Sequence, residues 1–291
     1  MGGPSLLSRR AALLGLAAAG GVPRGGLAAT EGFEAIEARL GGRVGVAALD
    51  TGSGRAVLHR QDERFAMCST FKATLAAAVL QRAQSGRLNL DDMATFARAE
   101  MLPNSPVTAA AADRRLSLRA LCAAAVSYSD NTAANLLLKK LGGPRRLTAF
   151  FRSVGDHVSR LDRIEMALNE NRPGDPRDTT TPAAMARTLR TLCLDGAVLG
   201  DAPRNLLRDW MLNERNGGRR IRSAAPEGWR VANKPGTSLN GAVNDIAVLW
   251  PDAGAPIVLS LYSNAPGAPL AASEQAIADT ARLALRGLGH A

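Results

Sequence analysis

Histidine, cysteine and aromatic residues are scarce in this 291-residue sequence, and each shortage argues against a class of structure or chemistry. Three cysteines cannot all pair with one another, which argues against a disulfide framework. The three histidines, His59, His157 and His290, lie far apart and form no His-x-His cluster. Zinc sites usually draw on closely spaced histidine or cysteine ligands, so we expect no metal and no cofactor.

Long blocks of one charge are also missing, although the formal net charge is +10. No run of lysine or arginine exceeds two residues, and aromatic residues, at 4%, are not interleaved with the basic ones. A nucleic-acid interface usually shows such clustering, so we expect no nucleic-acid partner. A solvated, arginine-rich surface is the simpler interpretation of the charge. The length is sufficient for a large core in one or two domains.

Apolar runs long enough to cross a bilayer are absent, and the stretch Ala11–Ala19 is too short to do so. It follows the twin-arginine pattern of residues 8–13, and the first 29 residues contain no acidic side chain. These features predict a twin-arginine export signal over residues 1–29, cleaved near Ala28 or Ala29. We expect a periplasmic or secreted monomer, free of the membrane after cleavage. The alternative is an Ala/Gly-rich N-terminus that carries no targeting signal.

The predicted secondary structure changes twice along the chain, from strands to helices and back to strands. Residues 34–40 suit a helix, and strand-like segments at 44–50 and 56–60 flank the turn 51–54, which predicts a hairpin. Residues 69–213 are rich in Ala and Leu with helical periodicity, including helices over 182–193 and 203–212. Strands follow at 229–233, 246–250 and 257–262, and then a helix over 273–288 with Ser273 as its N-cap. We therefore predict an α+β fold, with an α/β domain from residues 30–60 and 214–291 and an all-α domain from residues 61–213.

The most informative local pattern is Ser69-x-x-Lys72, which precedes an apolar segment. Residues three apart share one face of a helix, so the Lys72 amine can approach the Ser69 hydroxyl. A serine is a weak nucleophile until a nearby base takes its proton, and a lysine can be that base only if its pKa is lowered. The pair predicts a nucleophilic serine.

Three further motifs follow in order: Ser129-Asp130-Asn131, the segment Arg163–Asn169 with Glu165 inside it, and Lys234-Pro235-Gly236-Thr237. Ser-x-x-Lys, Ser-Asp-Asn and Lys-Thr-Gly are the signature of class A β-lactamases and penicillin-binding proteins. The segment Arg163–Asn169 resembles the Ω-loop that is found in class A β-lactamases. From about residue 31 to its end, the chain resembles this family, whose fold is an antiparallel sheet with terminal helices beside an all-α domain.

The resemblance implies a serine hydrolase that opens the β-lactam amide of penicillins and cephalosporins through a Ser69 acyl-enzyme. Either Lys72 or Glu165 takes the serine proton, and the sequence leaves both open. Glu165 would then activate the deacylating water, with Asn169 as the second contact of that water. The backbone N–H groups of Ser69 and Thr237 would form the oxyanion hole.

The remaining roles come from the same resemblance. Ser129 would pass a proton to the lactam nitrogen, and Lys234 would place positive charge near the substrate carboxylate. We expect Ser129 and Asn131 on an extended loop, since residues two apart point the same way there and diverge in a helix. Asp130 would brace that loop. The other implied residues are Asn131, Thr237, Arg220 and Asn104 for substrate binding and Arg163, Asp178 and Asn135 for structural support, with Arg219 and Arg222 as competitors for the role of Arg220.

Several positions depart from the family pattern. Pro235 replaces a hydroxyl that contacts the substrate carboxylate, and a proline fits an edge strand. Met166 replaces a proline that often follows the glutamate, and we predict a cis bond before it. Asn233 replaces an aspartate. We expect no disulfide, because the positions that pair with Cys68 and Cys122 in relatives hold Ser238 and Ala76.

These departures keep two other interpretations open. One is a penicillin-binding peptidase that shares the serine and lysine motifs but lacks a working Glu165, so that it stays acylated. The other is a weakly active or noncatalytic β-lactam-binding protein on the same fold.

Overall fold

The computed structural model describes residues 24–290. The predicted export signal thus lies largely outside the described residues, and helix α1 (Arg24–Leu40) begins within its expected last residues. Among the residues described, no helix combines the length and apolar character that a membrane span requires.

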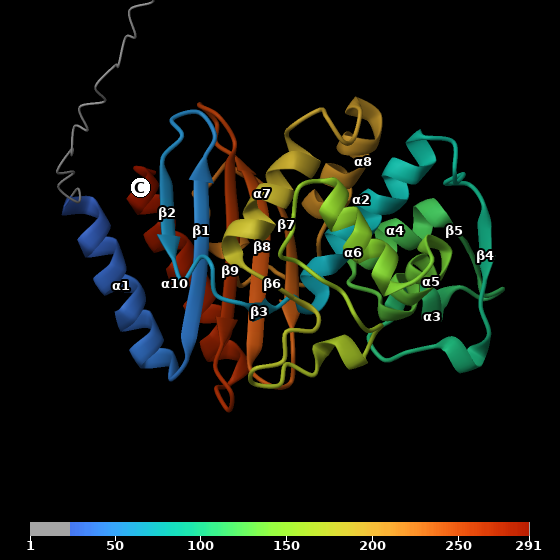
Figure 1. Ribbon diagram of the computed structural model, residues 1–291, viewed down its shortest axis with the longest axis horizontal. Helices are drawn as coiled ribbons and strands as arrows, with labels where there is room; N and C mark the ends of the chain where they lie inside the picture. The colour runs from blue at the N-terminus through green and yellow to red at the C-terminus, as the bar shows by residue number, and fades with distance from the viewer. Residues whose placement is uncertain (1–23, 291) are drawn as a thin grey trace, which may run out of the picture.

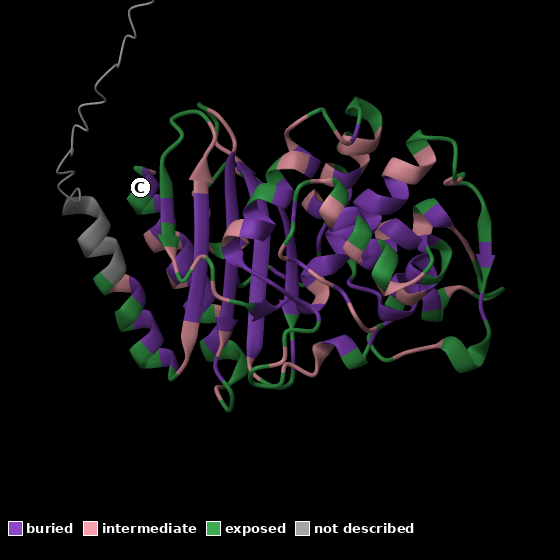
Figure 2. Ribbon diagram, viewed as in Figure 1, coloured by how far each residue is buried: buried purple, intermediate pink, exposed green. Residues whose placement is uncertain are grey.

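A five-stranded antiparallel sheet forms one side of the molecule, with the strands in the order β2-β1-β9-β8-β7 (Figure 1). Its strands are β1 (Arg43–Asp50), β2 (Ala56–His59), β7 (Arg230–Thr237), β8 (Ala242–Trp250) and β9 (Ile257–Asn264). Helices α1 and α10 (Leu270–Leu288) cover one face, and α7 (Pro182–Cys193) packs on the other. Strands β8 and β9 are therefore buried along almost their whole length (Figure 2). The predicted hairpin at the start of the sheet is confirmed.

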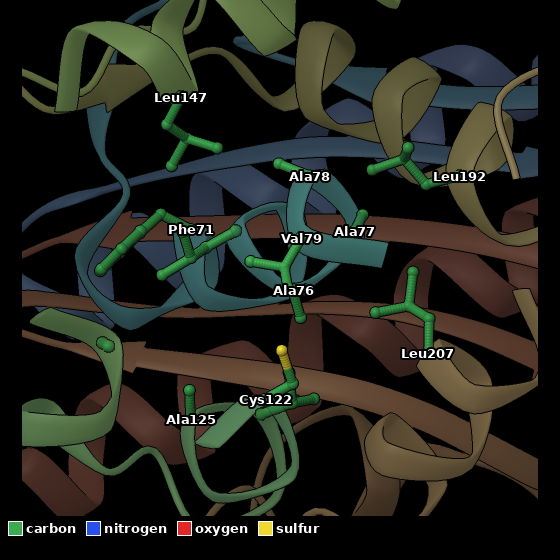
Figure 3. Close-up of a cluster of buried hydrophobic side chains, with 14 of the residues drawn as sticks. Phe71, Ala76, Ala77, Ala78, Val79, Cys122, Ala125, Leu147, Leu192 and Leu207 are labelled. Atoms are coloured by element: carbon green, nitrogen blue, oxygen red, sulfur yellow. The ribbon is translucent and has the colours of Figure 1, made fainter. Parts of the chain in front are cut away.

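A helical region lies beside the sheet, arranged around α2 (Phe71–Gln84), whose first ten residues are all buried. Small alanines at 76–78 let neighbouring helices pack closely against it, and Cys122 points toward Ala76 (Figure 3). The other helices of this region are α3 (Pro106–Ala110), α4 (Leu118–Ser127), α5 (Asn131–Leu141), α6 (Pro144–Ser153) and α8 (Asp201–Leu212). The predicted α+β fold is thus confirmed. The domain boundaries stay a prediction.

Several short elements complete the structure. Two-stranded pairs are formed by β3 (Phe65–Ala66) with β6 (Thr179–Thr180) and by β4 (Met93–Thr95) with β5 (Arg115–Ser117). The single turns are η1 (Cys68–Thr70), η2 (Arg98–Glu100), η3 (Ala167–Asn169) and α9 (Ile221–Ala224). Of these, η1 carries the predicted nucleophile from the sheet side into α2.

All three cysteines are buried and free, as the sequence predicted for Cys68 and Cys122. Burial raises the pKa of the Cys68 and Cys193 thiols to about 12. The thiols are thus held in their neutral form and behave as small apolar groups of the core.

Several boundaries differ from the sequence prediction. Helix α1 begins at Arg24 and strand β8 at Ala242, both earlier than expected. Ser273 is not an N-cap, because α10 begins one turn earlier, after Pro269, and the Ser273 N–H already donates to the Pro269 carbonyl at 3.1 Å. Strand β7 extends through Thr237 instead of ending at Asn233. It can include Pro235 because β7 is an edge strand of the sheet, where a missing N–H leaves no neighbour unpaired. The predicted edge position of Pro235 is confirmed.

Candidate active site

A cavity of about 810 Å³ opens between the edge strand β7 and the helical region. This size falls within the range of small-molecule sites. Seven of the residues predicted from the sequence line it: Ser69, Asn104, Ser129, Asn131, Asn169, Arg220 and Thr237. Lys72 and Lys234 are fully buried next to it, and Glu165 is almost so.

Ser69 and Lys72 meet at the junction of η1 and α2. The Lys72 Nζ lies 3.0 Å from the Ser69 Oγ, and it also donates to the Ser129 carbonyl at 2.8 Å and to the Asn131 Oδ1 at 2.6 Å. Burial lowers the pKa of Lys72, while the negative charge of Glu165 opposes that shift. The sequence prediction that these two side chains meet on one helical turn is confirmed.

Glu165 approaches the same lysine from the Ω-loop. Its Oε1 lies 2.9 Å from the Lys72 Nζ, which is an ion-pair distance, although the angle does not make it a hydrogen bond. The other carboxylate oxygen, Oε2, accepts from the Asn169 Nδ2 at 2.7 Å. Within residues 24–290, the buried Glu165 Oε1 and Asn169 Oδ1 receive no hydrogen bond. Two buried acceptors next to the cavity are therefore available to a water molecule or a substrate group.

The segment around Glu165 is fixed from both ends. The Asn135 side chain donates to the Glu165 carbonyl and accepts from the Glu165 N–H, each at 2.9 Å. At the neck of the loop, the Arg163 Nε donates to the buried Asp178 Oδ2 at 2.6 Å. Both predicted supports are thus in contact. The peptide bond between Glu165 and Met166 is cis, as predicted.

Ser129 and Asn131 face the cavity, but the predicted loop is only partly correct. Ser129 lies on a loop with φ of 55°, whereas Asn131 is the first residue of α5. Asp130 is the N-cap of that helix, because its Oδ1 accepts from the Ala133 N–H at 2.8 Å. Its carboxylate also accepts from the Thr108 N–H, so Asp130 braces this loop as predicted. At the first position of α5, Asn131 can still reach Lys72.

Lys234 lies on β7 and points into the same group of side chains. Its Nζ donates to the Ser129 Oγ at 3.1 Å and to the Pro235 carbonyl at 3.1 Å. Burial lowers the pKa of Lys234 to about 7, although the carboxylates of Glu214 and Asp245 oppose the shift. The sequence analysis missed Glu214, since no motif spacing connects it with Lys234.

Gly236 explains how β7 comes so close to the nucleophile. A Cβ at this position would lie 2.8 Å from the Met67 carbonyl and 3.1 Å from the Ser69 backbone nitrogen. Only a glycine lets the two backbones approach to this distance. The peptide that follows Gly236 therefore lies beside the Ser69 N–H, as two backbone donors of an oxyanion hole require.

Arg220 is only 3% exposed, which separates it from the exposed Arg219. Its guanidinium donates to the Thr237 Oγ1 at 2.8 Å and to the Gly236 carbonyl at 3.0 Å. The guanidinium also forms an ion pair with Glu274 of α10, at 3.2 Å, which fixes its position. Glu274 was not identified from the sequence, because it lies 54 residues away on an otherwise ordinary amphipathic helix. Arg222 lies behind β7, where it donates to the Asn233 Oδ1 at 2.8 Å.

Polar side chains form part of the rim of the cavity. The Asn104 Nδ2 lies 3.4 Å from the Ser129 carbonyl. Ser238, at the position of a cysteine in some relatives, donates to the Asn169 carbonyl at 2.6 Å and so connects the β7–β8 turn with the Ω-loop. Met166 also borders the cavity, and its Sδ lies 3.1 Å from the Asn131 Nδ2.

Comparison with known proteins agrees with this geometry. The profile described as "Beta-lactamase enzyme family" matches residues 28–288. The carbapenem-hydrolysing β-lactamase KPC of Klebsiella oxytoca is 48% identical over 89% of this chain and 88% of its own. β-Lactamase L2 of Stenotrophomonas maltophilia is 47% identical over 98% of this chain and 93% of its own.

Solved structures give the same result. The class A β-lactamase of the last common ancestor of Gram-negative bacteria superposes with a TM-score of 0.87 at 51% identity, covering 90% of this chain and 99% of the other. The putative class A enzyme PenP of Rhodopseudomonas palustris has a TM-score of 0.85 at 45% identity, covering 88% and 98%. The fold, the cavity and these similarities together show that the chain belongs to the class A β-lactamases, the serine hydrolases of β-lactams.

Proposed function

We propose that this enzyme opens penicillins and cephalosporins through a Ser69 acyl-enzyme, which water activated by Glu165 then hydrolyses. One observation carries the proposal. The buried Lys72 amine lies within 3.0 Å of both the Ser69 Oγ and the Glu165 Oε1, beside a cavity of substrate size. A nucleophile, its proton acceptor and a second base are thus in contact.

In the acylation step, the Ser69 oxygen bonds to the lactam carbonyl carbon and loses its proton to the Lys72–Glu165 pair. The Glu165 Oε1 lies 2.9 Å from the Lys72 Nζ, so its negative charge would stabilise the ammonium that Lys72 becomes when it takes the proton. Burial favours the neutral amine of Lys72, which is the form that accepts a proton.

The negative charge that develops on the lactam oxygen would be stabilised by the N–H groups of Ser69 and Thr237. One such donor typically lowers the activation barrier by about 2.7–4 kcal/mol. The close approach at Gly236 supports this assignment. Being backbone groups, both donors are kept in place by η1 and β7.

Collapse of the tetrahedral intermediate breaks the lactam C–N bond, and its nitrogen takes the Ser129 hydroxyl proton. Ser129 suits this role, because its Oγ lies 3.1 Å from the Lys234 Nζ and 3.4 Å from the Lys72 Nζ. Either ammonium can replace the transferred proton. Lys234 and Arg220 would at the same time attract the substrate carboxylate, and Asn131 and Asn104 would contact the substrate side chain.

Deacylation requires a base that holds a water molecule next to the ester. The Glu165 Oε1 and Asn169 Oδ1 are buried acceptors that receive no hydrogen bond from residues 24–290, and Asn169 fixes the orientation of the carboxylate. Glu165 would take one proton of that water while the water oxygen attacks the ester carbon. The Ser69 oxygen then leaves and regains a proton.

The test compares Glu165→Gln with Glu170→Gln, which makes the same chemical change in the same loop. Glu170 lies at the cavity wall, where it pairs with Arg163 and Arg172. We expect steady-state nitrocefin turnover to fall by at least about a hundredfold in Glu165→Gln, the lower range for general base catalysis. Glu170→Gln should retain turnover within a few-fold. Equal rates in wild type and Glu165→Gln would refute the assigned role.

We also propose twin-arginine export to the periplasm or the medium and a monomeric state. The pattern of residues 8–13 supports the first. For the second, the two apolar cores are completed by residues of a single chain. Replacing Arg9 and Arg10 with lysine should leave the protein in the cytoplasm, and light scattering should give the mass of one chain. Unchanged export or a dimer would contradict the respective proposal.

A further inference from the structure

A second cavity, of about 400 Å³, lies apart from the residues assigned to catalysis, between α6 and the segments that precede β3 and the Ω-loop. Its lining is unusually basic: Arg64, Arg145, Arg152, Arg160 and His157, together with Thr148 and Asp162. Arg145, Thr148 and Arg152 are three and four residues apart, so they share one face of α6.

Hydrogen bonds hold this cavity in shape. The Thr148 Oγ1 donates to the Leu161 carbonyl and accepts from the Leu161 N–H, each at 2.9 Å, which fixes the loop against α6. The Arg152 Nη1 donates to the Ser159 carbonyl at 2.8 Å and to the Asp156 carbonyl. The Arg64 Nη1 donates to the Thr179 Oγ1 at 3.0 Å. Arg64 and Arg152 are thus positioned before any ligand arrives, which lowers the entropy cost of binding.

Most of the positive charge in this cavity is not neutralised by a direct pair. Arg64 and Arg152 bond only neutral acceptors, and Arg145 and His157 make no hydrogen bond or ion pair with any residue that the structure describes. Only Arg160 has a carboxylate partner, Asp162, with atoms as close as 2.6 Å.

One further carboxylate lies beneath this cavity. The buried Asp156 is occupied by other donors, since its Oδ1 accepts from the N–H groups of Val158 and Ser159 and its Oδ2 accepts from the Thr188 hydroxyl. Counted with Asp156 and Asp162, the four arginines still leave a net positive charge around the cavity.

We propose that this cavity binds a phosphate oxyanion, either free or as the headgroup of an anionic phospholipid. The guanidinium groups come from three segments of the chain and match the oxygens of a tetrahedral phosphate. Arg145, which bonds no other residue that the structure describes, can donate two parallel hydrogen bonds to it. The Thr148 side chain fills the wall between Arg145 and Arg152, and a cavity of this volume accommodates a phosphomonoester-sized group. The site does not depend on the catalytic roles proposed above.

The test uses two adjacent arginines of α6 as a matched pair. Arg145 lines the cavity, whereas Arg146 is also exposed but does not line it. Both Arg145→Ala and Arg146→Ala remove one positive charge, so only Arg145→Ala removes a ligand contact. Inorganic phosphate is titrated into the ¹⁵N-labelled protein at constant ionic strength, with chloride as the balancing anion, and amide shifts of α6 and residues 157–162 are followed.

We expect saturable shifts in wild type and a rise in Kd of at least about tenfold in Arg145→Ala, the lower range for a charge-assisted hydrogen bond. Arg146→Ala should change Kd by less than about twofold, as expected for an exposed charge. Nitrocefin turnover that persists in both variants shows that they are folded. Linear, unsaturable shifts, or equal weakening by the two variants, would overturn the proposal and leave a diffuse basic surface.

A second arm distinguishes the two sources of phosphate. Co-sedimentation with phosphatidylglycerol vesicles, with phosphatidylcholine vesicles as the control, measures headgroup binding. Sedimentation that is lost in Arg145→Ala but kept in Arg146→Ala identifies the lipid headgroup as a ligand. Phosphate titration alone, without vesicle binding, identifies the free oxyanion. Absence of both in wild type would refute the site.

Discussion

Replacement of Arg220 by alanine should raise KM for β-lactams while leaving kcat nearly unchanged. Arg220 reaches the cavity beside Thr237, and the neighbouring Pro235 has no hydroxyl with which to bind a substrate carboxylate. We therefore expect the Arg220 guanidinium to supply the main contact with the substrate carboxylate on this side of the cavity. If the carboxylate contacts Arg220 both before and during the reaction, as we propose, loss of the contact weakens both states equally and raises KM.

The expected size follows from the contact that is lost. A hydrogen bond to a charged group is worth roughly 1.5–3 kcal/mol, which corresponds to about a 10- to 150-fold rise in KM. The effect should lie in the upper half of that range, because Arg220 is only 3% exposed and solvent screens it little. Introducing a hydroxyl with Pro235→Thr should recover part of the loss.

The assay measures kcat and KM for a cephalosporin and for the methyl ester of the same compound, which lacks the carboxylate charge. Arg220→Ala should lose its defect on the ester, since there is no charge left to bind. Arg219→Ala is the matched control, because Arg219 is exposed and does not line the cavity. It should behave as wild type on both substrates.

Removal of Arg220 also leaves the half-buried Glu274 without its cation, so the fold must be checked. Arg220→Lys keeps a positive charge and should fall between wild type and Arg220→Ala in KM. The reasoning would be refuted by a kcat defect at unchanged KM, or by an equal loss on the acid and its methyl ester in a variant that melts like wild type.

Three further outcomes are expected. The kcat/KM of wild type should be highest below about pH 7 and fall above it, since Lys234, with a pKa of about 7, then loses its charge. Lys234→Arg, which stays charged, should abolish that fall, and a flat wild-type profile up to pH ~9 would contradict the assignment. Asn135→Ala removes two hydrogen bonds to the Glu165 backbone and should lower the free energy of unfolding in urea by about 2 kcal/mol; a loss below ~0.5 kcal/mol would be against it. Dithiothreitol should leave Tm unchanged, because Cys68 and the other cysteines are free, whereas a fall of several degrees would reveal a disulfide.

The sequence predicted which side chains meet beside the cavity, because the motifs that carry them are local or strongly patterned. Ser69 and Lys72 are one helical turn apart, and the motifs around Ser129, Glu165 and Lys234 stand in a fixed order. The sheet and the helical region were predicted in the same way, from apolar periodicity and from turn residues.

What the sequence could not give depends on tertiary packing. It left Arg219, Arg220 and Arg222 as competitors, and only the packing of α10 against α9, with Glu274 as partner, selects Arg220. The prediction of Ser273 as an N-cap was wrong, because α10 begins one turn earlier, after Pro269. The basic cavity on α6 was not predicted either, since Arg64 comes from a segment about 80 residues away from Arg145 in sequence.

The covalent intermediate on Ser69 is the central claim, and intact-protein mass spectrometry tests it most directly. After incubation of Glu165→Gln with benzylpenicillin, we expect the protein mass to rise by one substrate, with the added mass on the peptide that contains Ser69. Wild type should clear the same adduct, and Ser69→Ala should never form it. An unmodified Glu165→Gln protein that still hydrolyses penicillin, or an adduct on another residue, would contradict the account.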